Sequence, residues 1–179
     1  MRARFAALLA SLPLAACAAE QIPSTAQLPP AFYGTLVDND TGAINEASYA
    51  LGSPARTRND PIEAIRAVVA VEYLAGELNT NPRWGSLSAM TKMQMLEARK
   101  DLRQELGIPQ NAPSQAVVNA LLWVMWQMQS NNQPGVMQAL SVPLFSKGAQ
   151  PTLQLLENLP VPASARVATA NAERGEFRF

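Results

Sequence analysis

The side chains that could do chemistry in this sequence are carboxylates, arginines, lysines and tyrosines, because it contains no histidine and a single cysteine, Cys17. Histidine is the commonest general base and metal ligand, so serine–histidine, cysteine–histidine and histidine–metal mechanisms are excluded. Ser88 lies four residues before Lys92, which also excludes a nucleophile at the Ser-x-x-Lys spacing. We therefore expect a protein that is not an enzyme, with no catalytic residue, no metal and no cofactor.

One carboxylate, Glu72, has an unusual position on a predicted helix. When residues 60–78 are placed at 100° intervals, Glu72 falls near the middle of the apolar arc, opposite the other charged side chains of that helix. A bare carboxylate is too costly to bury. We therefore expect Glu72 to form an ion pair with Arg99 or Arg103 of the next helix. The alternative is a functional acid that keeps its proton.

A second group of interest is Asn119, Trp123 and Trp126, which point away from the apolar face of a predicted helix over residues 113–130. That helix is apolar almost all round, which is typical of a helix buried on both sides. We expect the two tryptophans to pack against short C-terminal helices or against Phe32 and Tyr33. The alternative is that all three residues line a ligand or partner surface.

The segment Asp38-x-Asp40-x-Gly42, followed by Glu46, resembles part of a calcium-binding loop. It does not fit the EF-hand pattern, because the glycine comes one residue early and Tyr49 stands where glutamate is required. Aspartate, asparagine and glycine are also ordinary turn residues. We therefore expect a turn here, with a metal site as the minor alternative.

These residues must be positioned by helices, since no segment has the alternating pattern of a strand. We expect an all-α, irregular helical bundle with three long helices, over residues 60–78, 87–106 and 113–130. Asp60 is the expected N-cap of the first, Gly107 ends the second, and Asn111 is a possible cap of the third.

Shorter elements complete the predicted bundle. A short extended segment is expected at 32–37, and short helices at 46–51, 134–140, 149–158 and 163–172. The predicted domain organisation is a signal peptide over 1–16, a flexible Pro-rich tether over 17–31, a helical domain over 32–172 and a C-terminal tail over 173–179.

The N-terminus carries the most specific motif of the sequence. Two arginines precede a short apolar stretch over residues 5–16, which ends in the tetrad Leu14-Ala15-Ala16-Cys17. A basic start, an apolar centre and small residues before the break are typical of a secretory signal. The tetrad resembles the lipobox of bacterial prolipoproteins, at all four positions. That resemblance implies cleavage before Cys17 and lipid on its thiol and amine; plain cleavage after Ala18 is the alternative.

The resemblance also implies a location. Ala18 and Ala19 follow the cysteine, and the absence of an acidic residue there favours an outer-membrane lipoprotein that faces the periplasm. Without Arg2 and Arg4 the chain carries a net charge of about −2, which argues against nucleic-acid binding. Charged residues make up only 16% of the chain, against an ordinary ~25%, so we expect a surface that is rich in Gln, Asn, Ser and Thr or is partly covered by a partner.

Three functions remain open at this point. The first is a non-enzymatic, lipid-anchored envelope protein that binds or scaffolds a protein partner. The second is a periplasmic carrier of a small hydrophobic ligand or lipid, held between helices. The third and weakest is an enzyme of cell-wall glycan that uses Glu72 with another carboxylate.

Overall fold

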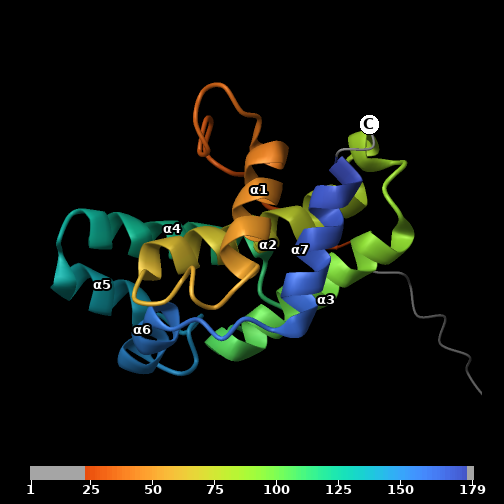
Figure 1. The fold of residues 1–179 in the computed structure, drawn as a ribbon. Coiled ribbons are helices and arrows are strands. Elements are labelled where there is room, and N and C mark those ends of the chain that lie inside the picture. Colours follow the sequence, from red (N-terminus) through yellow and green to blue (C-terminus); the bar gives the residue numbers. More distant parts are fainter. Residues whose placement is uncertain (1–22, 177–179) are drawn as a thin grey trace, which may run out of the picture.

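The computed structural model describes residues 23–176, which form helices and contain no β-strand (Figure 1). The predicted all-α class is confirmed. The signal sequence and Cys17 lie outside the described residues. The elements, in chain order, are α1 (Asn39–Leu51), α2 (Pro61–Thr80), the 3₁₀ turn η1 (Pro82–Trp84), α3 (Ala89–Leu106), α4 (Ser114–Gln129), α5 (Gln133–Leu140), α6 (Ala149–Glu157) and α7 (Ala163–Glu176).

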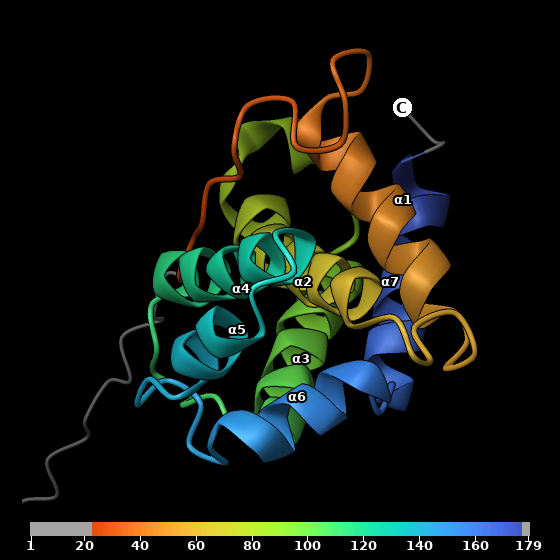
Figure 2. The same cartoon turned by 90° about the vertical axis from the view of Figure 1, so that its left-hand side faces the viewer.

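Helix α2 is the centre of the molecule. It packs against α1, α3, α4 and α6, and Figure 2 shows it with α4 and α5 on one side and α1 and α7 on the other. Nearly all of its residues from Ala64 to Leu78 are buried, whichever way they point. Any charged side chain that α2 directs inward must therefore find its partner within the protein.

The three long helices begin and end close to where local capping chemistry predicts. Asp60 Oδ1 accepts from the Glu63 amide at 3.0 Å, which confirms Asp60 as the N-cap of α2. Gly107, with φ of 69°, ends α3 as expected. Asn111 is not the cap of α4, because Pro113 occupies that position. The amide of Ser114 donates instead to the Ser24 hydroxyl, 2.9 Å away.

The region before α2 differs from the prediction. Residues 32–37 form turns rather than an extended segment, and α1 begins at Asn39, seven residues before the expected helix. The side chain of Asp38 caps α1, since its Oδ1 accepts from the amides of Asp40 and Thr41 at 3.1 Å each. The expected turn at Asp38–Gly42 is therefore the first turn of a helix. A Cβ at Gly42 would collide with the Tyr33 side chain, so glycine allows the preceding turn to fold back on α1.

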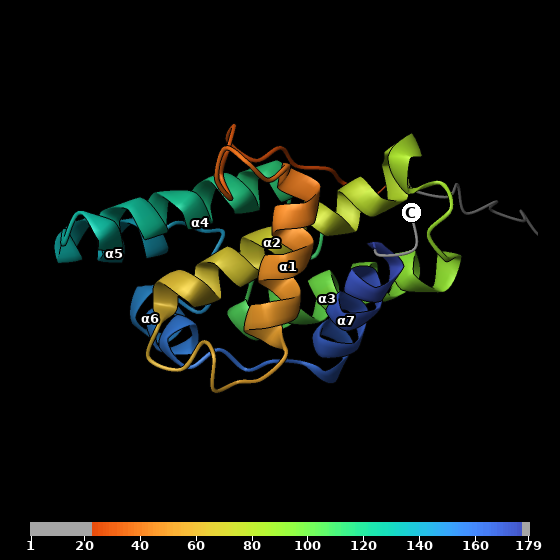
Figure 3. The same ribbon diagram turned by 45° about the horizontal axis from the view of Figure 1, so that its top comes forward.

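The last part of the segment predicted to be a tether lies against the helical domain. Ala26 and Leu28 are buried, and Gln27 exchanges two hydrogen bonds with the side chain of Gln115 on α4. A Cβ at Gly76 of α2 would lie 2.7 Å from Thr25 Cα, so the glycine lets this segment lie directly on the central helix. Figure 3 shows the segment, in red and orange, running across the top of the molecule toward α1.

The C-terminal boundary also differs. Helix α7 continues to Glu176, so most of the tail expected over residues 173–179 is helical. It packs against α3 and α1, and Glu173 Oε2 accepts a hydrogen bond of 2.5 Å from the Ser48 hydroxyl on α1. The last turn of α7 is thus tied to the body of the protein.

Candidate functional site

Glu72 lies inside the protein and is paired with Arg103, one of the two arginines expected to reach it. Arg103 Nε lies 2.6 Å from Glu72 Oε1 and Nη2 lies 2.7 Å from Oε2. Arg103 also donates to the Ser114 hydroxyl and to the carbonyls of Gln110 and Ala112, at 2.9–3.1 Å. The pair therefore joins α2, α3 and the loop before α4, and both carboxylate oxygens of Glu72 are occupied.

Arg99, one helical turn before Arg103, does not bond to Glu72. Its Nη1 donates to the Ser24 carbonyl at 2.8 Å and to the Ser114 hydroxyl at 3.0 Å. Burial lowers the pKa of Arg99; the negative charge of Glu72 opposes this effect and the positive charge of Arg103 adds to it. Arg99 is thus a half-buried cation whose partners among residues 23–176 are neutral.

A hollow of about 560 Å³ opens beside these two arginines. Its wall contains Pro23 and Ser24 of the N-terminal segment, Leu96, Arg99 and Arg103 of α3, and residues 110–113 of the loop before α4. We call it the arginine pocket. A second hollow, of about 330 Å³, lies between α3 and α7, and its wall includes the polar residues Thr91, Asn171 and Arg174.

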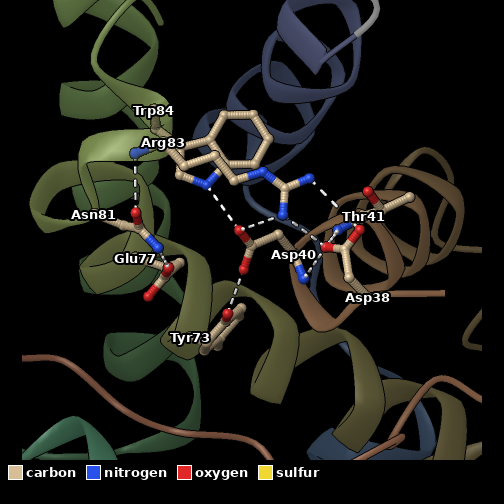
Figure 4. A network of polar contacts seen from close by, with 8 residues as sticks. All are labelled: Asp38, Asp40, Thr41, Tyr73, Glu77, Asn81, Arg83 and Trp84. Atoms are coloured by element: carbon tan, nitrogen blue, oxygen red, sulfur yellow. Dashed lines mark hydrogen bonds and ion pairs between the residues drawn. The ribbon is translucent and has the colours of Figure 1, made fainter. Parts of the chain in front are cut away.

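Figure 4 shows a buried carboxylate that the sequence did not single out as a partner of α2. Asp40 Oδ1 accepts from the Tyr73 hydroxyl, and Oδ2 accepts from Trp84 Nε1 at 3.0 Å and from Arg83 Nη1 at 3.2 Å. Burial, and then the hydrogen bond to Asp40, raises the pKa of Tyr73. The network fastens α1 to α2 and η1.

The same network occupies the acidic oxygens of the segment that resembles part of a calcium-binding loop. The oxygens of Asp40 are taken by protein donors, and Asp38 accepts from two backbone amides and from Arg83 Nη1 at 3.0 Å. Within residues 23–176 no three acidic or cysteine side chains lie close enough together to hold a metal ion. The two aspartates act as a helix cap and as a buried hydrogen-bond acceptor.

A second pair of acids lies between α1 and the start of α2. Arg66 Nη2 donates to Glu46 Oε2 at 2.6 Å, while Glu46 Oε1 and the Tyr33 hydroxyl are buried without a partner among the described residues. Burial, and next the negative charge of Glu46, raises the pKa of Glu63 to about 6. Glu46 and Glu63 therefore influence each other's charge, as two neighbouring carboxylates do, and Glu72 is not part of this pair.

Trp123 and Trp126 lie on the surface of α4, so the expectation that they pack inside is wrong. Their side chains are 54% and 53% exposed, and the two rings stack with centroids 4.8 Å apart and planes inclined by 28°. Asn119, also exposed, precedes Trp123 by one turn and accepts from Gln115 Nε2 at 2.9 Å. We call the exposed side of α4 formed by Asn119, Trp123 and Trp126 the tryptophan face.

The tryptophan face belongs to an uncharged part of the chain. No aspartate, glutamate, lysine or arginine occurs from Leu106 to Ser146, a span that includes all of α4 and α5. Uncharged surfaces with exposed aromatic rings are typical of the centre of protein interfaces, where charged residues are depleted. This gap in the charge pattern was the sequence signal that could have marked the surface.

Comparison with known proteins adds no relative: no family model, no curated protein and no solved structure matches this chain. Among the described helices, none is long and apolar enough to cross a membrane. The geometry of the described residues is therefore the basis for a proposed function.

Proposed function

We propose that this chain is a non-enzymatic, lipid-anchored envelope protein that binds a protein partner through the tryptophan face. The observation that carries the proposal is the stacked, half-exposed pair Trp123–Trp126 on an uncharged helix. Tryptophan is enriched among the few residues that dominate interface energies. The side-chain amides of Gln115 and Asn119, joined by a hydrogen bond, precede the pair on α4 and offer the kind of polar group found at the rim of such interfaces.

The buried charges support a structural rather than a catalytic role. Glu72 is held by Arg103, and Asp40 is held by Tyr73, Trp84 and Arg83, so each carboxylate already has protein donors on its oxygens. A glycosidase needs two free carboxylates across one cleft. Glu72 has no second acid within its network.

No observation favours the carrier hypothesis over partner binding. A carrier of a hydrophobic ligand needs a largely apolar cavity. The arginine pocket has two guanidinium groups beside apolar residues such as Leu96, and the hollow between α3 and α7 includes serine, threonine, asparagine and arginine side chains.

The anchor is the second part of the proposal and comes from the lipobox at Cys17. Lipid at this position would hold the protein on the outer membrane, facing the periplasm, with the helical domain close to the bilayer. Two acyl chains suffice for a stable anchor, because each buried methylene contributes about 0.8 kcal/mol. The low charge of the chain fits a protein that works in a complex at that surface.

The anchor is tested by the intact mass of protein extracted from bacterial membranes, with Cys17→Ser as the control. We expect the native protein to begin at Cys17 and to carry diacylglyceryl and a further acyl chain, and the variant to lack both. A native chain that begins at residue 19 without lipid would remove the anchor from the proposal.

The partner surface is tested by photo-crosslinking in intact cells, with a photoreactive residue in place of Trp123. The matched control is the same residue in place of Tyr49, an aromatic side chain on α1 that is 58% exposed. We expect a discrete protein adduct at position 123 and none at 49, lost in a Trp126→Ser background. Crosslinks to lipid alone at position 123 would overturn protein binding and make the bilayer the occupant of this face.

A further inference from the structure

The arginine pocket is built where three parts of the chain meet. Helix α3 supplies Arg99 and Arg103, the loop before α4 supplies Gln110 and Asn111, and the N-terminal segment supplies the wall at Pro23 and Ser24. The pocket is separate from the tryptophan face in its residues and in its chemistry. Its volume of about 560 Å³ is in the range of small-molecule sites.

Among residues 23–176, the charges around the pocket do not cancel. Glu72 is the carboxylate that interacts electrostatically with Arg99, but both of its oxygens accept hydrogen bonds from Nε and Nη2 of Arg103. Glu97, on the same helix, is paired with Lys100, and Asp101 accepts from Ser164. One positive charge, that of Arg99, therefore stays without an acidic partner among residues 23–176. Partial burial disfavours the charged form of Arg99, and a bound anion would offset that cost.

The free donors of Arg99 have the geometry that an oxyanion needs. Nη1 is taken by Ser24 and Ser114, whereas Nε and Nη2 have no hydrogen-bond partner among the described residues. A guanidinium edge with two parallel N–H groups binds carboxylate or phosphate oxygens in a fork. Gln110 and Ser114 are held in place by Lys100 and Ser24, so the polar surroundings of Arg99 are already ordered.

The position of the pocket favours phosphate over carboxylate. Pro23, in its wall, comes six residues after Cys17. An extended chain of six residues spans at most about 20 Å, so a lipid on Cys17 would keep the pocket close to the bilayer surface. Phosphate is the anion that every phospholipid headgroup presents there.

We propose that the arginine pocket binds a phosphate group through Arg99, either that of a phospholipid headgroup or that of a soluble phosphate compound. The oxyanion site follows from the uncompensated charge and the free donors of Arg99. The preference for phosphate over carboxylate, and the lipid source, rest on the anchor in the proposed function. Failure of the anchor would therefore leave an oxyanion site, with a soluble compound as its ligand.

The test is a titration of the Cys17→Ser protein, otherwise full length, with inorganic phosphate, followed by NMR through the Nε–Hε resonance of Arg99. We expect a saturable shift of that resonance and a dissociation constant that rises at least about tenfold in Arg99→Gln. The matched control is Arg58→Gln, which removes the same charge from an exposed position in the loop before α2. It should bind phosphate as the parent protein does.

Two results would overturn the proposal: a shift that does not saturate, or equal weakening in Arg58→Gln and Arg99→Gln, which means unspecific attraction to positive charge. Arg99→Lys keeps the charge without the fork and covers the case in which Arg99→Gln fails to fold; it should bind more weakly than the parent protein. A short-chain phosphatidylglycerol below its micelle concentration separates the sources. Affinity at least tenfold above that of inorganic phosphate assigns the lipid, and equal or lower affinity assigns the soluble compound.

Discussion

Arg103 donates two hydrogen bonds to Glu72, from Nε to Oε1 at 2.6 Å and from Nη2 to Oε2 at 2.7 Å, and neither side chain is more than 3% exposed. The remaining donors of Arg103 reach backbone carbonyls of the loop that leads to α4. Because the pair is buried, its value to the fold depends on both partners being present. Removing one partner leaves an uncompensated charge inside the protein.

We therefore expect Glu72→Ala to lower the free energy of unfolding by about 3–5 kcal/mol, measured by urea denaturation. The double variant Glu72→Leu with Arg103→Leu should lose much less, because it leaves no charge unpaired. A loss below about 1 kcal/mol in Glu72→Ala would contradict a stabilising role for this ion pair.

The Asp40 network predicts a second effect on stability. Asp40→Asn keeps the shape of the side chain but replaces one acceptor oxygen by an amide donor, which then faces the donors Tyr73, Arg83 or Trp84. We expect a loss of about 1–3 kcal/mol in the free energy of unfolding. Asp38→Asn is the control, because asparagine caps a helix as well as aspartate does. It should cost less than 1 kcal/mol, since the ion pair to Arg83 is half-exposed.

Glu63 predicts a dependence of stability on pH. Burial, and then the nearby charge of Glu46, raises its pKa from the ordinary 4.5 to about 6. Between these two values the folded protein binds the proton more tightly than the unfolded chain does. Glu63 therefore destabilises the fold increasingly as pH rises from 4.5 to 6, fully above pH 6, and not below 4.5.

Glu63→Gln should accordingly raise the free energy of unfolding at pH 7.5 and have no such benefit at pH 4.5. The gain should stay below about 1 kcal/mol, because the side chain is partly exposed and solvent screens its interactions. Glu97→Gln is the matched control on α3, where the exposed carboxylate is paired with Lys100. A stabilisation of the same size in both variants would show that net charge, and not the contact with Glu46, is responsible.

Gly76 predicts a local effect without loss of the fold. In Gly76→Ala the new methyl group would lie 2.7 Å from Thr25 Cα and 2.8 Å from the Ser24 carbonyl oxygen, so the N-terminal segment must move away from α2. We expect faster hydrogen exchange at the Gln27 amide, which donates to Gln115 in the native protein. Gly85→Ala, where the nearest atom is the Pro82 carbonyl oxygen at 3.1 Å, should leave exchange at Gln27 unchanged.

Local chemistry was enough to predict part of this fold. Asp60 before Pro61 and the glycine at 107 mark helix ends with groups only a few residues apart, so capping rules identify them directly. The position of Glu72 on the apolar arc of α2 also predicted that a basic residue from the neighbouring helix must meet it. Arg99 lies on the same side of α3 as Arg103, so periodicity alone did not distinguish the two.

Other features depend on residues far apart in the chain. Asp38 has the same side-chain chemistry in a turn and at a helix N-cap, so its preference did not separate the two structures. Asp40 meets Tyr73 and Trp84, 33 and 44 positions further along the chain, and no local pattern connects them. A helical wheel showed that Trp123 points away from the core but not whether another element covers it.

The absence of ionisable groups from Leu106 to Ser146 has a consequence for how α4 and α5 respond to their surroundings. No side chain in this span can gain or lose a proton, so its charge does not change with pH. Salt likewise has no side-chain charge there to screen. The contribution of α4 and α5 to any contact on the tryptophan face should therefore not change with pH or with salt concentration. The charge of the tryptophan face is thus independent of pH, whereas the stability of the helical domain depends on pH through Glu63.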